Sequence, residues 1–433
     1  MPFFNFGVEK EKNTDKIRRM IKIPELLAPA GTLDAFKTAI LYGADAIYAG
    51  LPGFSMRARA KITTEEVKTS IDLAHDSGKK VYLAFNLFAH DSEYVNMPRV
   101  SETIRYLAPD ALIVSDPGVL MWVRENHPNI PLHISTQANI CSAASVKFWQ
   151  AAGASLCVLA REVSHNEFIS IRRACPDIKL EIFVHGAMCM AYSGRCLLSN
   201  FITGRPANRG ACAQLCRWKY DIILRERESG IEMPIDEDER GTYIMNSRDL
   251  CLMPRLADVI SAGPDSLKIE GRNRSEYYVG SVVHAYRLAI DAYARAPENF
   301  DPEKYMKMLN ILESRGYTTA FFDGPLPPSA HNYETTRSDS DFHAAGVITN
   351  ISDDYVTMEL RNEIKTGDEI TFVLPNCVDN VTVKIDQIIN ARDCVTMQKM
   401  SAGQHNAIKI PRKWIPEKYW NLIFPLVLAY KHK

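Results

Sequence analysis

The chain reads Glu25-Leu-Leu-Ala-Pro-Ala30, then a longer amphipathic stretch, then Ala46-Ile-Tyr-Ala-Gly50. A short apolar run, a helix-length amphipathic run and a second apolar run make a βαβ unit, from which parallel sheets are built. The pattern recurs as far as Arg272. The further strand-like runs are Lys80–Asn86, Ala111–Asp116, Leu132–Gln137, Leu156–Arg161, Leu180–His185 and Ser266–Gly271. Eight such units predict an α/β fold, a closed TIM-like (β/α)8 barrel.

The regions around this barrel predict the domain order. The interval between the seventh and eighth runs, about 186–264, is too long for one helix with its turns, and it carries closely spaced cysteines. Long insertions in compact domains are usually functional, so we expect a cysteine-bearing insertion here. The segment Leu326–Ser340 is rich in proline, serine and charge and marks a boundary. The predicted domains are an N-terminal extension at 1–23, the barrel at 24–325 and a C-terminal β domain at 341–433.

Short β-rich runs separated by Gly, Asn and Asp turns fill the C-terminal part. They are Ala344–Thr349, Tyr355–Leu360, Glu369–Val373, Asp379–Ile385 and Asn406–Ile410. Regular short spacing of this kind predicts a small β-barrel-like domain. Such a domain could bind RNA, hold a partner protein or cap the barrel.

The composition is that of a soluble globular protein. Of the 433 residues, 46% are hydrophobic and 24% are charged, and the formal net charge is −1. A globally cationic nucleic-acid binder is thereby excluded, so any RNA contact has to come from a local basic surface. The sequence has neither a basic-then-apolar leader nor an apolar run of membrane-spanning length. We expect a cytoplasmic protein with no membrane partner.

Polar residues stand at or next to the ends of several predicted strands. In a (β/α)8 barrel these ends form the rim on which active sites are built. The predicted catalytic residues are Gln137, Arg161, His185, Glu270 and Arg272. Arginine pairs with carboxylates through two parallel hydrogen bonds, so Arg161 and Arg272, with Lys268, could hold a small dicarboxylate co-substrate. Salt bridges that close the barrel mouth are the equal alternative.

Four cysteines lie within 28 residues: Cys189, Cys196, Cys212 and Cys216. In a reducing compartment they are not expected to form disulfides, and thiolates are soft ligands that suit zinc or an iron–sulfur cluster. Structural zinc sites commonly use paired knuckles with about two to four residues between the cysteines, and here only the second pair has that spacing. The pattern favours a 4Fe–4S cluster, with zinc as the alternative.

The fourth ligand has a second candidate. Cys251 could replace Cys216, although Cys216 closes a smaller loop with Cys212 at less entropic cost. His185 precedes Cys189 by four residues, which would suit a cysteine nucleophile with a histidine base. A nucleophile leaves the other three thiols of the cluster unexplained. The scattered thiols expected to serve only in packing are Cys141, Cys157, Cys175, Cys377 and Cys394.

The sequence resembles peptidase family U32, the collagenase-like peptidases. The resemblance rests on Cys189-Met-Ala-Tyr-Ser-Gly-Arg-Cys196 with its flanks, on Glu25-Leu-Leu-Ala-Pro-Ala-Gly31, on Gly43-Ala-Asp-Ala-Ile-Tyr48 and on Ser266-Leu-Lys-Ile-Glu-Gly-Arg272. It therefore spans essentially the whole barrel. Within the family the chain looks closest to the tRNA hydroxylation protein P group, through Gly241-Thr-Tyr-Ile-Met-Asn-Ser-Arg-Asp-Leu250 and the appended β domain.

This resemblance implies an iron–sulfur enzyme that modifies tRNA. Members of the group are associated with oxygen-independent 5-hydroxylation of the wobble uridine, with prephenate as the hydroxyl donor. Related members act on ribosomal RNA or on quinone precursors, which are small aromatic substrates. Matched by motif position, the ligands would be Cys189, Cys196, Cys212 and Cys216, and relatives that take the fourth from further downstream keep Cys251 open. A collagenase-like peptidase and a zinc-clasped RNA-binding scaffold are the other functional hypotheses.

Overall fold

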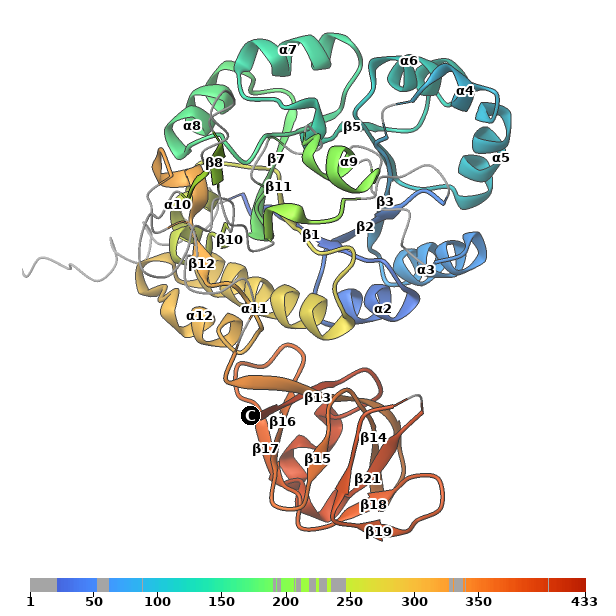
Figure 1. Cartoon of the computed structure of the whole chain (residues 1–433), viewed down its shortest axis with the longest axis vertical. Coiled ribbons are helices and arrows are strands. Elements are labelled where there is room, and N and C mark those ends of the chain that lie inside the picture. Colours follow the sequence, from blue (N-terminus) through green and yellow to red (C-terminus); the bar gives the residue numbers. More distant parts are fainter. Residues whose placement is uncertain are drawn as a thin grey trace, which may run out of the picture.

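Eight parallel strands close into a barrel in the computed structural model of the chain (Figure 1). The structure describes residues 22–52, 62–87, 89–189, 192, 196–205, 207, 212–217, 223–225, 232–234, 247–326, 330, 338, 340–403 and 405–433. The barrel strands are β1 (Glu25–Pro29), β2 (Ala46–Gly50), β3 (Lys80–Phe85), β4 (Ala111–Val114), β5 (Leu132–Ile134), β6 (Leu156–Val158), β7 (Lys179–Gly186) and β11 (Ser266–Ile269). They pair in this order, and β7 pairs with β11 to close the ring. The predicted (β/α)8 barrel is confirmed, while the predicted extension at 1–23 lies almost wholly outside the described residues.

Helices surround the barrel and connect its strands. They are α2 (Leu33–Leu41), α3 (Thr64–Asp76), α4 (Asp91–Tyr94), α5 (Met97–Leu107), α6 (Pro117–Asn126), α7 (Ala143–Ala151), α8 (His165–Ala174), α10 (Leu256–Ser261), α11 (Glu276–Arg295) and α12 (Glu303–Leu309). Asp116, at a predicted strand end, accepts the amide hydrogens of Gly118 and Val119 and so caps α6. Among the described helices, none is long and apolar enough to cross a membrane.

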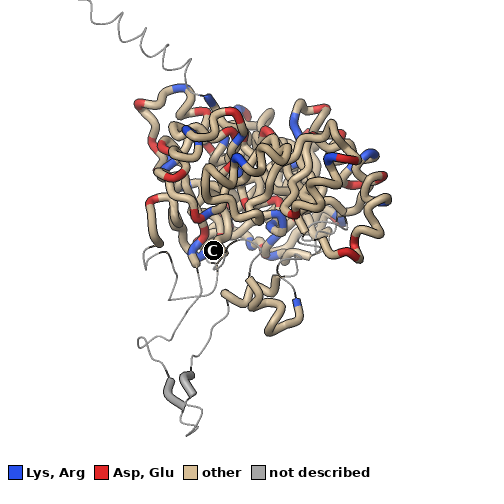
Figure 2. The backbone as a smooth tube through the Cα atoms, turned by 90° about the horizontal axis from the view of Figure 1, so that it is seen from above, with Lys and Arg blue, Asp and Glu red and all other residues tan. Residues whose placement is uncertain are grey.

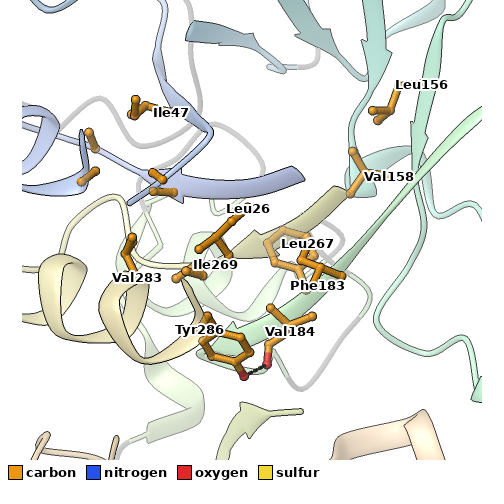
Figure 3. Packing of buried hydrophobic residues seen from close by; sticks show 14 of the residues in the cluster. Leu26, Ile47, Leu156, Val158, Phe183, Val184, Leu267, Ile269, Val283 and Tyr286 are labelled. Atoms are coloured by element: carbon orange, nitrogen blue, oxygen red, sulfur yellow. Dashed lines mark hydrogen bonds between the residues drawn. The ribbon is translucent and has the colours of Figure 1, made fainter. Parts of the chain in front are cut away.

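The main core lies between the barrel strands and the outer helices. Figure 3 shows Leu26, Ile269 and Val184 pointing toward α11, where Val283 and Tyr286 face them. The Tyr286 hydroxyl donates to the carbonyl oxygen of Val184 at 2.7 Å. Burying each such side chain contributes roughly 1.5–3 kcal/mol relative to leaving it in water, so the alternating apolar residues of the strands hold the barrel and its helices together.

The strand ends at the barrel mouth differ from the sequence-based boundaries. β5 ends at Ile134, and Gln137 lies in the single turn η1 (Thr136–Ala138), which Ser135 caps through the Gln137 amide. β7 continues to Gly186, whose φ is +116° and where a Cβ atom would lie 2.5 Å from the carbonyl oxygen of Glu270. Only glycine permits this close approach, so Gly186 lets β7 run past Glu270.

The insertion between β7 and β11 contains short elements. Its described elements are α9 (Leu198–Thr203), η3 (Leu215–Arg217), β8 (Ile223–Arg225), β9 (Glu232–Pro234), β10 (Asp249–Cys251) and η4 (Met253–Arg255). β10 runs antiparallel to the end of β7, and β12 (Tyr317–Thr318) pairs with β10 in parallel. The range predicted for the insertion, about 186–264, also includes α10, which is the ordinary barrel helix of this unit.

The C-terminal part forms an eight-stranded antiparallel sheet with the order β17-β16-β22-β13-β14-β21-β18-β19. Its strands, with the small β15–β20 pair, are β13 (Phe342–Ile351), β14 (Tyr355–Leu360), β15 (Ile364–Lys365), β16 (Glu369–Val373), β17 (Val381–Lys384), β18 (Ile388–Asn390), β19 (Thr396–Met397), β20 (Lys399–Met400), β21 (Ala407–Pro411) and β22 (Leu428–His432). All five predicted strands are present. Sequence analysis missed β15, β18, β19, β20 and β22, of which β22 lies between β16 and β13.

A tyrosine hydroxyl joins this sheet to the barrel. Tyr42, at the end of α2, donates to the carbonyl oxygen of Val373 at 2.8 Å and accepts the amide hydrogen of Leu428 at 3.0 Å. A Cβ atom on Gly280 of α11 would lie 2.6 Å from Leu428 Cδ1, so glycine makes room for Leu428. Arg361 of the C-terminal part pairs with Glu276 of α11 at 2.8 Å. The sheet therefore packs against α2 and α11 through a partly polar contact.

We expect Tyr42→Phe to weaken this contact. The substitution leaves a buried carbonyl oxygen and a buried amide without partners, at a cost of about 1–3 kcal/mol. The measurement is hydrogen exchange of the Leu428 amide, together with the unfolding free energy in urea. Tyr106→Phe is the matched control, because Tyr106 is 52% exposed. Equal exchange of the Leu428 amide in the wild type and in Tyr42→Phe would contradict the role assigned to the hydroxyl.

Candidate active site at the barrel mouth

The interior of the barrel combines a small apolar cluster with a buried ion pair. Lys268 of β11 donates to the Glu181 carboxylate of β7 at 2.8 Å, and the two side chains are 5% and 1% exposed. The Lys268 ammonium also lies 4.4 Å from the centre of the Tyr48 ring. Charges taken out of water cost several kcal/mol unless they are paired, so this ion pair satisfies a requirement of the barrel interior.

Nearer the mouth, a second pair joins Arg161 and Glu270, with 3.6 Å between Nη2 and Oε2. The Arg161 guanidinium lies 4.1 Å from the centre of the Phe183 ring, and the Tyr48 hydroxyl lies 3.4 Å from the Glu270 carboxylate. Arg161 and Lys268 thus already face carboxylates of the protein. Of the two predicted roles for Arg161 and Lys268, the structure therefore has the salt bridges within the protein. It does not leave these two side chains unpaired for a carboxylate of a ligand.

The remaining mouth residues are also buried. Ser115 donates from its hydroxyl to Gln137 Oε1 at 3.2 Å. Arg272 is 8% exposed, and its guanidinium lies 6.0 Å from the centre of the Tyr48 ring. Gln137, Arg161, Glu270 and Arg272 therefore all lie at the C-terminal end of the barrel.

The His185 ring is separated from these side chains, although the His185 carbonyl oxygen accepts the Glu270 amide hydrogen at 2.8 Å. Its ring packs among Tyr278 and Tyr286 of α11 and Tyr317 of β12, with centroid distances of 6.0, 5.7 and 5.4 Å. Burial lowers the pKa of His185 to about 4. Its Nδ1 atom has no hydrogen-bond partner among the described residues. This enclosure fits a neutral packing residue, and it separates His185 from the polar groups of the mouth.

Deeper in the barrel lie polar residues that the sequence analysis missed, because it considered only strand ends. The Tyr82 hydroxyl donates to the Glu25 carboxylate at 2.9 Å, and burial raises the pKa of Glu25. Burial, followed by nearby lysines including Lys268, lowers the pKa of His133 to about 3. The signal that could have found them is the period of two along each strand, which turns alternate residues inward.

The four clustered cysteines lie on the insertion or at its start. Cys189 and Cys212 are exposed, and Cys196 and Cys216 are half-buried. The Gln214 amide donates to Cys212 Sγ at 3.3 Å, and Ser199 of α9 accepts the Ala213 amide hydrogen at 2.8 Å. An amide hydrogen directed at sulfur is typical of a ligated thiolate.

Four soft donors fit a four-iron cluster or a zinc ion by their chemistry. Within the described part of the chain, no three His, Cys, Asp or Glu side chains gather as a metal-binding group. The ligand set therefore stays a prediction.

The other thiols divide into buried and exposed ones. Cys251 is 1% exposed and contacts the Tyr286 hydroxyl and the Met306 sulfur, and burial raises its thiol pKa to about 11. This packing does not favour Cys251 as a metal ligand. Cys157 and Cys175 are buried as expected, but Cys394 is exposed beside Lys409. The expectation of packing was wrong for Cys394, because its turn lies at the edge of the C-terminal sheet.

A cavity of about 330 Å³ lies beside Cys189. Its described lining combines polar groups with apolar side chains and comes from four separate segments. The residues are Glu162, Met188, Cys189, Tyr192, Ser247, Arg248, Thr318, Phe321, Leu326 and Ala330. Of the predicted site residues, only Cys189 lines this cavity.

The profile of peptidase family U32 matches residues 31–332 of the chain. The chain belongs to peptidase family U32. Its relatives include tRNA hydroxylation protein P of Haemophilus influenzae, which is 36% identical over 90% of this chain and 94% of the relative. A collagenase of Porphyromonas gingivalis is 31% identical over 90% of this chain and 96% of its own length. The 23S rRNA 5-hydroxycytidine C2501 synthase of Escherichia coli is 36% identical over 62% of this chain and 39% of its own length.

The buried ion pair gives a stability prediction for this U32 protein. Lys268→Met leaves the Glu181 carboxylate unpaired in the barrel and should cost about 3–5 kcal/mol of unfolding free energy. The double variant Lys268→Met/Glu181→Gln should recover most of this loss. Lys79→Met, which removes a more exposed partner of Asp45, should cost at most about 1 kcal/mol. Urea denaturation of the four proteins measures these differences. A Lys268→Met variant as stable as Lys79→Met would refute the assignment.

Proposed function

We propose that this protein hydroxylates RNA, and specifically carbon 5 of the wobble uridine of tRNA, without dioxygen. The observation that carries the proposal is the similarity, over 90% of the chain, to a protein named for tRNA hydroxylation. A relative named for 5-hydroxycytidine synthesis in 23S rRNA supports the same reaction class on another RNA. Ribosomal RNA is therefore the alternative substrate, and a small aromatic compound is a further one.

The reaction requires a redox group. Hydroxylation at carbon 5 replaces a C–H bond by a C–O bond and removes two electrons from the base, which ordinary side chains do not accept. We infer that Cys189, Cys196, Cys212 and Cys216 hold a 4Fe–4S cluster, which would supply electron transfer when bound. Prephenate is the proposed hydroxyl donor and also the proposed electron acceptor: its C–OH bond breaks as the new C–O bond forms, and it takes up the two electrons and the proton that leave the base. Zinc in the same four thiols would instead make a structural clasp on an RNA-binding scaffold.

The mouth residues suit the binding of a pyrimidine base. Because Gln137 Oε1 already accepts from Ser115, its Nε2 hydrogens are left to donate to a uracil carbonyl oxygen. We assign Arg161, whose guanidinium lies over the Phe183 ring, to stack on the base, and we assign Glu270, its ion-pair partner, to accept the proton that leaves carbon 5. These roles keep three of the five predicted catalytic residues, Gln137, Arg161 and Glu270, and leave out His185 and Arg272.

The cysteine-bearing segment also has the composition of an RNA contact. From residue 182 to residue 220 there is no Asp or Glu, and the segment contains Arg195, Arg205, Arg209, Arg217 and Lys219. Its helix α9 lies in front of the barrel strands in Figure 1, and in Figure 2 the projecting segment shows blue but no red. Leu197 and Phe201 are 74% and 89% exposed. Basic groups attract phosphates, and an exposed ring can stack on an unpaired base.

A collagenase-like peptidase is the second candidate, since a collagenase is among the relatives. A cysteine peptidase needs a base in contact with its thiol. Here Cys189 is exposed, whereas His185 is enclosed by three tyrosine rings. This geometry does not favour the Cys189–His185 pair. The C-terminal domain stays a proposed surface for a protein partner.

The ligand set makes a first prediction for the proposed function. Cys189→Ser, Cys196→Ser and Cys212→Ser should each lower the iron and sulfide content of anaerobically purified protein severely. Cys216→Ser should do the same and Cys251→Ser should not, because Cys251 packs in the core. Cys394→Ser is the control, an exposed thiol outside the set. Iron and acid-labile sulfide are measured chemically, and tRNA from a deletion strain is analysed for loss of 5-hydroxyuridine derivatives.

Two outcomes would reject these assignments. Stoichiometric zinc without iron or sulfide, under conditions that preserve clusters, rejects the iron–sulfur centre. Unchanged wobble uridines in the deletion strain, with no second enzyme compensating, reject the tRNA substrate.

The exposed ring of α9 makes a second prediction. Phe201→Ala should weaken the binding of unmodified tRNA by about 5- to 150-fold, which corresponds to the roughly 1–3 kcal/mol of one stacked base. Phe148→Ala is the matched control, because Phe148 of α7 is 62% exposed and lies outside the insertion. Fluorescence anisotropy with labelled tRNA gives both dissociation constants. If the two variants bind equally well, α9 is not part of the RNA surface.

A further inference from the structure

The cavity beside Cys189 has the size and lining of a small-molecule site. Its volume is about 330 Å³, and its described walls come from the loop after β6, the segment after β7, the approach to β10, and β12 with the segment that follows it. Arg248, Ser247 and Thr318 supply polar groups, and Phe321 and Leu326 supply apolar surface. Ligand sites commonly combine an apolar wall with a few convergent polar groups in this way.

Arg248 differs from the other arginines and the lysine near the mouth. Arg161 pairs with Glu270, Lys268 pairs with Glu181, and Arg315 pairs with Asp249. Arg248 has no ion pair, and its buried Nε atom has no hydrogen-bond partner among the described residues. A buried donor without a partner costs about 1–3 kcal/mol, which a ligand carboxylate would recover.

The backbone and stem of Arg248 are fixed. Its amide donates to the carbonyl oxygen of Ala330 at 2.9 Å, and its Cδ atom would lie 3.4 Å from a Cβ atom built on Gly316. The Nε edge of a guanidinium, together with one terminal nitrogen, can hold both oxygens of a carboxylate. Arg248 is therefore a cation whose backbone and stem are held in place, while its Nε atom has no partner within the described part of the chain.

One acidic residue also lines the cavity. Burial raises the pKa of Glu162, which reduces its opposition to a bound anion.

We propose that this cavity binds the co-substrate of the reaction, a small carboxylate with an apolar or ring-shaped body, through Arg248. The apolar body lies against Phe321 and Leu326, and the ligand is placed next to Cys189. The inference rests on the proposed function, because it assigns the co-substrate of that same reaction. It moves the carboxylate site from Arg161, Arg272 and Lys268 to a residue that the sequence analysis did not select.

The test uses the full chain with prephenate as the probe, measured by isothermal titration calorimetry. Arg248→Gln should weaken binding by about 10- to 150-fold, the loss of a charged hydrogen-bonded contact of roughly 1.5–3 kcal/mol. Arg248→Lys should recover only part of this, because it keeps the charge without the planar fork. Arg255→Gln is the control, an arginine of η4 that is 43% exposed and pairs with Asp258 and Asp323.

A second variant tests the cavity without changing Arg248, in case Arg248→Gln fails to fold. Leu326→Trp fills the cavity from its partly exposed edge and should abolish prephenate binding while Arg248 is intact. Thermal unfolding midpoints of all variants identify those that remain folded.

The outcomes separate the cavity from the proposed function. Loss of binding in Arg161→Gln or Arg272→Gln, with Arg248→Gln and Leu326→Trp unaffected, overturns the cavity and leaves RNA hydroxylation standing. If a wild-type preparation that hydroxylates tRNA does not bind prephenate, the cavity assignment is likewise overturned and RNA hydroxylation stands. Binding that depends on Arg248, with tRNA hydroxylation unaffected by deletion of the gene, supports the cavity and rejects the proposed function.

Discussion

The pairing of charges inside the barrel is the constraint on which the rest of the structure depends. A barrel of eight strands encloses a space that most TIM-like proteins fill with branched apolar side chains. Here Lys268 and Glu181 occupy that space, and each is tolerable only because the other is 2.8 Å away. The Arg161–Glu270 pair repeats the arrangement nearer the mouth. The two ion pairs set the positions of the charged side chains at the bottom of the site. They also engage Arg161 and Lys268, which a ligand carboxylate would otherwise bind.

The need to pair buried charges also explains which parts of the barrel and of its site could be predicted from the sequence. The eight strands were identified because strands buried on both faces appear in the sequence as short apolar runs, and eight runs of this kind have one simple closed arrangement. Four of the predicted catalytic residues do lie together at the mouth. Which of them are already paired could not be predicted, because an ion pair between Arg161 and Glu270 depends on the register of β6, β7 and β11 rather than on any local pattern.

Two further differences have local physical causes. His185 closes a predicted strand just as Glu270 does, but the pairing of β10 with the end of β7 and the rings of α11 and β12 enclose it. Arg248 went unselected because it belongs to no strand-end pattern. Its significance comes from what surrounds it in space, a cavity wall assembled from segments that are far apart in the chain.

The position of β22 also has a consequence for how the chain is made. β22 lies between β16 and β13, and its Leu428 amide donates to the Tyr42 hydroxyl of α2. Because β22 is the last strand in chain order, β16 and β13 have no shared neighbour until it has been synthesised. On the ribosome, then, the barrel can close well before the C-terminal sheet has its central strand. During that interval the surface of α2 and α11 that the sheet will cover stays exposed to solvent.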